Sequence, residues 1–218
     1  MTEYEKTPRT TLKRAHKRGQ YDRKTVHAII DEALVCHVAV STASGIMNIP
    51  SSHWRIDDTL YIHGAAKGAS ILALEQGNDA CIAISLLDGA VFARSVFSHS
   101  VNFRSVLIYA QGRAVEDPEK INILKAFIEK YAQGRWDKVR PPAPQELKAT
   151  KIIAFDLKEV SAKIRSAPPD DSDLEWDVWA GVVPLALTRQ NEQECQHSKI
   201  SHPVSDGLLP HINKRENK

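Results

Sequence analysis

Cysteine is scarce in this chain of 218 residues, and its few cysteines form no local pattern. The chain has three cysteines, Cys36, Cys81 and Cys195. Their odd number and the absence of a C-x-x-C pair argue against a disulfide framework and against a zinc site. The first two lie inside apolar, strand-like runs, so we interpret them as small buried hydrophobic residues. This cysteine usage favours a reducing compartment.

Long apolar runs and familiar catalytic motifs are also missing. No stretch approaches the ~18 apolar residues of a membrane span, and the start of the chain lacks the apolar stretch of a secretory signal peptide. We therefore expect a soluble, cytoplasmic protein with no membrane partner. The motifs GxSxG, HExxH, GxxxxGK[ST] and GxGxxG do not occur, which excludes the hydrolase, zinc-protease, P-loop and Rossmann sites that they mark.

Charge of the two signs is nearly balanced but unevenly spread. Residues 1–24 contain eight Lys or Arg and three acidic residues, a local +5, so the remainder sums to −3 because the net charge is +2. We interpret this basic start as a solvated arm or a first helix, because a nucleic-acid-binding protein would place its basic surface on the folded body. No nucleic-acid partner is expected. The predicted organisation is an arm over 1–20, a folded domain over 21–188 and a polar, flexible tail over 189–218.

Short strands and a few helices follow one another along the folded part. Apolar alternation and turn residues predict strands over 35–40, 46–54, 59–63, 80–85, 90–96, 104–115 and 151–164. Capping residues and helical spacing predict helices from Asp22 to about residue 34, and over 71–76, 117–131 and 144–149. Residues 86–89 are expected to form a turn. Because most strands are joined by short turns, the fold class is α+β, a mainly antiparallel β-barrel with helical decoration.

Two segments are suited to binding an anion. The polar run that leads into the strand at 106–110 contains four side chains that can hold a phosphate: His99, Asn102, Arg104 and Ser105. The alternative is an ordinary polar loop with a salt bridge. In the second segment, Lys67, Gly68 and Ser70 lie where a small-residue loop enters a helix, which suits an anion unless the loop is only a tight turn. Each segment offers half of a phosphate clamp.

Two further segments are suited to a planar ligand. A strand made irregular by its proline exposes backbone groups to a flat polar heterocycle; its residues are Ile49, Pro50, Ser51, Ser52, His53 and Trp54. Trp54 could stack on such a ring or lie in the core. Trp176 and Trp179 could close over a planar ligand or over a subunit boundary. A metal site built from the scattered histidines is not favoured, and none is predicted.

From about Arg18 to Pro184, the chain resembles the flavin-binding split-barrel proteins related to pyridoxamine 5′-phosphate oxidase, in particular the branch of nitroimidazole-reductase-like flavoproteins. The segments that carry this resemblance follow the family's order: Arg18-Gly19-Gln20-Tyr21-Asp22, Leu60-Tyr61-Ile62-His63-Gly64, Leu86-Leu87-Asp88-Gly89, Ala93-Arg94-Ser95, His99-Ser100-Val101-Asn102-Phe103-Arg104-Ser105-Val106, Gly134-Arg135, Arg140-Pro141-Pro142, Ser161-Ala162-Lys163 and Trp179-Ala180-Gly181-Val182-Val183-Pro184.

The resemblance implies a six-stranded antiparallel split barrel and a homodimer with one FMN at each end of its interface. It places the FMN phosphate at Lys67, Gly68 and Ser70, and the phosphate and ribityl chain near Asn102, Arg104 and Ser105. The strand from Ile49 to Trp54 would lie along the isoalloxazine ring. Trp176 or Trp179 would come from the partner subunit. His63 and His99 complete the set of cofactor-binding residues that we predict.

One departure from the family pattern concerns the phosphate. Relatives commonly carry Ser-Arg where this chain has Gly68-Ala69, so Lys67 is the remaining cation nearby. The predicted function is an FMN-dependent oxidoreductase that reduces a small molecule at the flavin, with no catalytic side chain assigned, because the flavin supplies the chemistry. The alternatives are a non-catalytic flavin-binding protein, and a heme-binding or heme-degrading split-barrel protein with His63 or His99 as the iron ligand.

Overall fold

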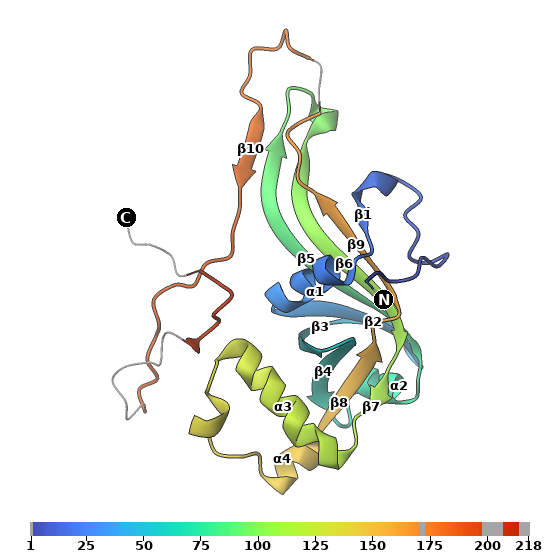
Figure 1. Cartoon of the computed structure of the whole chain (residues 1–218), viewed down its shortest axis with the longest axis vertical. Coiled ribbons are helices and arrows are strands. Elements are labelled where there is room, and N and C mark those ends of the chain that lie inside the picture. Colours follow the sequence, from blue (N-terminus) through green and yellow to red (C-terminus); the bar gives the residue numbers. More distant parts are fainter. Residues whose placement is uncertain (1, 171–172, 198–206, 214–218) are drawn as a thin grey trace.

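The computed structural model describes residues 2–170, 173–197 and 207–213, and one curled sheet organises them (Figure 1). The strands are β1 (Gly19–Gln20), β2 (Val35–Thr42), β3 (Gly45–Ile56), β4 (Thr59–Ala65), β5 (Asp79–Phe92), β6 (Ser100–Gln111), β7 (Arg113–Ala114), β8 (Thr150–Asp156), β9 (Glu159–Arg165) and β10 (Gly181–Pro184). They are arranged in the order β1-β9-β6-β5-β2-β3-β4-β8-β7, and β10 pairs with β5. All these pairings are antiparallel, as predicted for a split barrel.

Among the described residues, four α-helices pack around the sheet, and the sequence predicted each of them. They are α1 (Arg23–Glu32), α2 (Ala69–Glu75), α3 (Asp117–Tyr131) and α4 (Pro144–Ala149), with short 3₁₀ turns η1 (His16–Arg18), η2 (Val96–Ser98) and η3 (Trp136–Lys138). The Asp22 carboxylate accepts a hydrogen bond of 2.8 Å from the Thr25 amide, which caps α1 at its start. Pro118 lies in the first turn of α3, where its missing N–H costs no helical hydrogen bond. No helix of the described residues is long and apolar enough to cross a membrane.

Two of the strand predictions are wrong. Residues 86–89 form no turn, because β5 runs unbroken past them, with a β-bulge between Leu87 and Gly89. An Asp-Gly pair is typical of turns, yet a bulge also uses glycine, so the local signal is ambiguous. The single strand expected over 151–164 is instead the hairpin β8–β9, which bends at Leu157 and Lys158 without a Gly or Pro to mark the bend.

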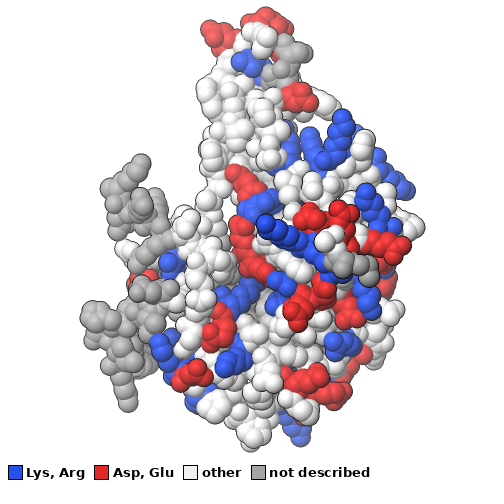
Figure 2. Space-filling view, in the orientation of Figure 1, with Lys and Arg blue, Asp and Glu red and all other residues white. Residues whose placement is uncertain are grey.

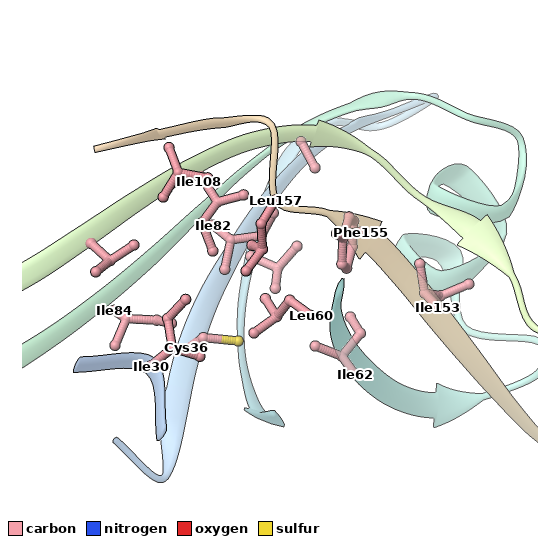
Figure 3. Packing of buried hydrophobic residues seen from close by; sticks show 14 of the residues in the cluster. Ile30, Cys36, Leu60, Ile62, Ile82, Ile84, Ile108, Ile153, Phe155 and Leu157 are labelled. Atoms are coloured by element: carbon pink, nitrogen blue, oxygen red, sulfur yellow. The ribbon is translucent and has the colours of Figure 1, made fainter. Parts of the chain in front are cut away.

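The inward faces of the strands enclose the main hydrophobic core. Figure 3 shows side chains from α1, β2, β4, β5, β6 and β8 converging there, among them Ile30, Cys36, Leu60, Ile82, Ile108 and Phe155. A second, smaller cluster lies between the outer face of β3, β4 and β8 and helix α3; its buried members are Trp54, Tyr61, Val115, Ile123, Ile152 and Ala154. Helix α3 therefore covers one side of the sheet near β3 and β4, whereas α1 belongs to the main core.

Both ends of the described chain pack on the body. Tyr4 is only 4% exposed and its hydroxyl donates to Asp58 over 3.0 Å. The N-terminal segment 1–20, predicted to be solvated, is therefore packed on the protein at this point. β1 also pairs with β9. Residues 207–213 of the predicted flexible tail lie against the end of α3, where the Leu209 amide donates to the Tyr131 carbonyl over 2.6 Å. Residues 198–206 and 214–218 of that tail lie outside the described residues.

Strands β5 and β6 extend beyond the barrel as a long hairpin closed by η2, with β10 along its outer edge (Figure 1). We call this projection, residues 87–103 with β10 and residues 173–180 that lead into β10, the arm. Its register is fixed by continuous pairing, for example Val91 with Ser100 and Val91 with Val182. The paired part of the arm is thus an extension of the sheet rather than a loop.

Candidate functional site

Strands β3 and β4 separate near the middle of the sheet. They pair only from His53–Ile62 to Ile56–Thr59, whereas residues 45–52 of β3 pair with β2 alone. β4 continues along β8 as far as Ala65. In the described part of the chain, β3 therefore has an edge without a strand partner over 45–52. We call this separation the β3–β4 fork. Residues 49–52 of β3 form one side of it. Residues 63–67, the end of β4 and the turn that follows, form the other side.

The segment Ile49–Trp54, predicted to lie along a planar ring, has one part at the fork and one part in the protein interior. Ile49 packs partly against the main core, Pro50 is exposed, and Ser51 and Ser52 are half-buried. These four residues border the fork and leave backbone groups accessible along one edge. His53 and Trp54, the last two residues of the segment, are buried and belong to the protein interior.

Trp54 takes the core role that the sequence left open. It is 1% exposed, its ring is stacked on Tyr61 at 5.9 Å between centroids, and it lies 4.8 Å from the Phe127 ring of α3. Its buried Nε1 has no hydrogen-bond partner among the described residues. A ring so enclosed is not accessible for stacking on a cofactor.

His53 is fully buried below the fork. Its Nε2 donates to the Ile30 carbonyl over 2.9 Å, so Nδ1 is the unprotonated nitrogen of the neutral ring. Burial lowers the pKa of His53 to about 4, and the nearby Lys130 ammonium acts in the same direction. The ring is therefore neutral in the folded chain at pH 7.

This buried imidazole predicts an acid-sensitive fold. The unfolded chain binds a proton at His53 below about pH 6.5, whereas the folded chain does so only near pH 4, so stability falls as the pH drops through that window. Between pH 7 and 5, we expect the native chain to lose about 2 kcal/mol more stability than His53→Gln. Urea unfolding at both pH values measures this difference. The exposed control His16→Gln should keep the native pH dependence, and equal slopes for His53→Gln and the native chain would contradict the assignment.

The sequence does not single out Lys130 as a site residue, because a lysine in an amphipathic helix is typical of a solvated face. Its ammonium instead donates to three backbone carbonyls, those of Ala33 at 2.7 Å, His53 at 3.0 Å and Ile30 at 3.3 Å. Burial lowers the pKa of Lys130 to about 8. One side chain of α3 thereby joins the end of α1 to β3 at the fork.

His63 lies on β4 at the fork, on the face covered by α3. It is half-buried, with its ring 5.1 Å from Phe127 and 5.9 Å from Trp54. Its buried Nδ1 has no hydrogen-bond partner among the described residues, and burial lowers the pKa of the ring. His63 is thus a neutral imidazole next to the fork with one nitrogen unsatisfied.

The segment Lys67–Ser70, which the sequence predicts to bind phosphate, lies at the open end of the fork. Lys67 is exposed in the turn after β4, Gly68 is the N-cap of α2, and Ser70 is buried within the helix. The Gly68 amide donates to the Ala65 carbonyl over 2.9 Å, and no side chain caps α2. This places one exposed cation and a stretch of uncapped backbone amides beside the open edge of β3.

The other residues predicted to bind phosphate already form ion pairs or hydrogen bonds within the chain. The Arg104 guanidinium forms ion pairs with Glu32 of α1 and, at 2.8 Å, with Asp88 of β5, and these hydrogen bonds raise the pKa of Arg104. The Asn102 side-chain oxygen accepts from Arg165 and from the Ala167 amide. Ser105 makes a long hydrogen bond of 3.4 Å to the Lys163 carbonyl. A phosphate at Arg104 would have to compete with two carboxylates.

The two predicted halves of a phosphate clamp do not meet in one chain. Helix α2 packs beside Gly112, where an added Cβ would lie 2.9 Å from the Leu74 carbonyl oxygen. Arg104 precedes Gly112 by eight residues of nearly continuous strand, which corresponds to roughly 25 Å. Lys67 and Arg104 therefore lie toward opposite ends of β6.

The ion pairs of Arg104 predict a structural effect on substitution. Arg104→Ala leaves the Glu32 and Asp88 carboxylates without their partner, and we expect unfolding free energy to fall by about 1–3 kcal/mol. Arg104→Lys keeps the charge but not the bidentate geometry, so its loss should be smaller. Urea unfolding gives both values. Unchanged stability together with lost flavin would instead support the phosphate contact predicted from the sequence.

Trp176, Trp179 and His99 gather on the arm rather than at the fork. The two tryptophans are 62% and 66% exposed, and the Trp179 ring lies 5.9 Å from Phe92. Phe92 also contacts the ring of His99, at 5.9 Å in an edge-on arrangement. His99 is exposed and donates from Nδ1 to the Ser95 carbonyl over 2.9 Å, so Nε2 is the ring nitrogen that this hydrogen bond does not use.

Among the described residues, no group of three or more His, Cys, Asp or Glu side chains is placed to hold a metal ion. Two surface grooves lie elsewhere. One of about 430 Å³ between α1 and α3 is bordered by Asp31, Lys130 and His211. The other, of about 540 Å³, is bordered by Arg9, Tyr109 and Arg113 where β6 ends and β7 begins. Of the predicted binding segments, Ile49–Ser52 and Lys67–Ser70 lie at the fork, whereas the others lie elsewhere.

Solved structures resemble the chain over 66–96% of its length. The flavocytochrome Anf3 from Azotobacter vinelandii is 30% identical, with 96% of this chain and 98% of that chain covered and a TM-score of 0.87. The FAD and heme binding protein from Mycobacterium smegmatis is 27% identical, with 88% and 98% covered and a TM-score of 0.82. A structure from Bacteroides thetaiotaomicron, described as a proposed 5-nitroimidazole antibiotic resistance protein, shares the fold at 22% identity, with 66% and 84% covered and a TM-score of 0.54.

Sequence comparisons complete this assignment. No curated protein sequence matches the chain. The family model described as pyridoxamine 5′-phosphate oxidase matches residues 22–164, which include β2 to β8 and most of β9. The predicted family and fold class are thereby confirmed. The chain belongs to the pyridoxamine 5′-phosphate oxidase family and has its split-barrel fold.

Proposed function

We propose that this protein is a flavin-dependent oxidoreductase that binds its flavin at the β3–β4 fork and reduces a small molecule there. The observation that carries the proposal is the fork itself, where the open edge of β3 lies beside an exposed lysine. A flavin needs both features, because its pyrimidine ring is a flat array of donors and acceptors and its phosphate is an anion. The relation to a flavocytochrome along 96% of the chain supports the same cofactor class.

Each part of the fork has a role in this proposal. Backbone groups of Ser51 and Ser52 would pair with the ring edge, and Ile49 would offer apolar contact. Lys67 and the backbone at Gly68 would hold the phosphate, without help from Arg104 of the same chain, which is paired with carboxylates. The bound flavin would supply the hydride and electron transfer. The protein would orient the ring and exclude water from it.

A homodimer is part of the proposal. In one chain, Trp176 and Trp179 lie on the arm, and their exposed rings contact no residue of the fork that the structure describes. A second subunit would bring one of these rings over the flavin of the first. The site would then be incomplete in a monomer, and dissociating the dimer would release the flavin.

The first test is the absorbance spectrum of the purified protein, followed by chromatography of the heat-released cofactor against FMN and FAD. The sequence predicts FMN, whereas the Mycobacterium smegmatis relative is described as binding FAD, and this measurement separates the two. Anaerobic addition of NADPH or NADH should bleach the flavin bands.

Lys67→Gln should weaken flavin binding at least about tenfold, since a charge-assisted contact is lost. Lys158→Gln, another exposed lysine, is the matched control. A protein that takes up neither flavin would overturn the proposal.

Heme binding is the second candidate. Two structures similar to this chain over most of its length are named for heme or as a cytochrome, and His99 has the arrangement of a ligand imidazole. Its Nδ1 is fixed by the Ser95 carbonyl, which orients the ring and leaves Nε2 for iron. His63 is the alternative ligand. A Soret band that is lost in His99→Ala but not in His63→Ala would assign His99, the converse would assign His63, and a protein without such a band after heme addition would exclude this function.

A further inference from the structure

The arm exposes an unusual amount of apolar surface. Phe97 and Val96 at its tip are 97% and 94% exposed, and in the segment that leads to β10 Leu174 is 76% and Trp176 62% exposed. Isolated exposed hydrophobic residues are normal, but several large ones on one projection mark a contact surface. We therefore expect this apolar surface to contact a binding partner.

The same segment carries charge of one sign. Residues 166–188 contain five acidic residues and no lysine or arginine. Asp170, Glu175 and Asp177 are exposed and Asp173 is half-buried, and within the described residues none of the four forms an ion pair. We call residues 173–179, with their acidic and tryptophan side chains, the acidic loop. An acidic rim of this kind disfavours an anionic membrane surface and favours a basic partner.

A complementary basic surface exists on the same chain. Residues 6–21 contain six lysine or arginine residues and no acidic residue. Lys13, Arg14, Lys17 and Arg18 are exposed and form no ion pair in the part of the chain that the structure describes. We call residues 13–18 the basic turn. Figure 2 shows lysine and arginine side chains gathered on the side of the molecule where β1 and η1 lie in Figure 1.

The basic turn is held in place rather than loose. β1 follows it directly and pairs with β9 through Gly19 and Lys163. On its other side, Arg9 is anchored to Asp79 and Glu159, and the Tyr21 hydroxyl donates to the Thr10 carbonyl over 2.8 Å. A fixed cluster of positive charge can serve as a docking surface, because little conformational entropy is lost when a partner binds.

We propose that the acidic loop of one chain docks on the basic turn of a second copy. The two unpaired charge clusters have opposite sign, and the described residues of one chain do not pair them with each other. In a twofold dimer each contact occurs twice, so a chain with one cluster of each sign is self-complementary. The tryptophan of the acidic loop that does not cover the flavin would be buried by this contact. The inference rests on the proposed homodimer and adds the surfaces that meet in it.

Charge exchange tests the contact. The turn variant carries Lys13→Glu, Arg14→Glu and Lys17→Glu, and the loop variant carries Asp173→Lys, Glu175→Lys and Asp177→Lys. Each alone would place like charges opposite one another, so we expect its dimer dissociation constant to rise at least about a hundredfold in about 50 mM salt. An equimolar mixture restores opposite charges at both contacts, and a heterodimer with a dissociation constant within about threefold of the native value should form. Sedimentation equilibrium and native mass spectrometry measure both, with circular dichroism to verify folding.

The outcomes separate this contact from the dimer itself. Dimers of native affinity in both variants would overturn the contact and leave the homodimer in place. Weakened variants that do not recover on mixing would also overturn it, since the losses would then not arise from this pairing. A native chain that stays monomeric at all accessible concentrations would remove the homodimer on which the inference rests. Recovery on mixing supports the contact whether or not a flavin is bound.

Discussion

Trp54→Ala is expected to lower the free energy of unfolding by about 3–5 kcal/mol. The indole is almost fully buried between the sheet and α3, against Tyr61 and Phe127, and its removal leaves a cavity that the rigid strands cannot close. Urea unfolding followed by circular dichroism measures the loss, and it avoids the fluorescence change caused by deleting a tryptophan. The loss would appear with or without a cofactor, because protein side chains already enclose the ring.

Two comparisons make this result decisive. Trp54→Phe keeps most of the buried volume, and its loss should be about 1–2 kcal/mol. Trp179→Ala removes a ring that is 66% exposed, so its effect on the stability of one chain should be within about 1 kcal/mol. If Trp54→Ala cost no more than Trp179→Ala, the core role of Trp54 would be refuted and stacking on a ligand would return as its explanation.

Lys130→Met is expected to lower the free energy of unfolding by about 2–4 kcal/mol. The methionine fills much of the lysine's space but cannot donate, so the carbonyls of Ile30, Ala33 and His53 lose their shared partner. Two of these carbonyls belong to the end of α1, which has no other cation in its last turn. Thermal and urea unfolding at pH 7 measure the change.

The matched control for this variant lies on the same helix. Lys125 of α3 is exposed, so Lys125→Met should change stability by no more than about 0.5 kcal/mol. Equal small effects of the two substitutions would show that the buried hydrogen bonds of Lys130 contribute little. Because His53 lies at the fork, Lys130→Met should also loosen flavin binding if the proposed site is right, whereas Lys125→Met should not.

Elements with strong local signals were predicted closely from the sequence. Helix α3 has the predicted bounds because Pro118 fixes its start and its apolar spacing defines its length. Asp22 likewise marks the start of α1. Strand β5 was divided in the prediction because Asp88-Gly89 is compatible with both a turn and a bulge, and only pairing with β6 decides between them.

The site could be predicted less completely, for a physical reason. Residue types identified the segments at Ile49–Ser52 and Lys67–Ser70, and the fold places both at the fork. Which side chains are free depends on contacts between distant parts of the chain. Arg104 has the chemistry of a phosphate ligand, but its partner Glu32 lies 72 residues away. No local pattern reveals that such a guanidinium is occupied.

The antiparallel ladder has a consequence for how the protein is made. β4 is completed by β8, and β6 is completed by β9, so both closing strands come from residues 150–165. During synthesis from the N-terminus, the hairpins β2–β3 and β5–β6 can form early, because their partners are close in sequence. The nascent chain must nevertheless carry open edges on β4 and β6 until β8 and β9 leave the ribosome. We therefore expect closure of the barrel to be a late step, with unfinished chains exposed to edge-to-edge association before it.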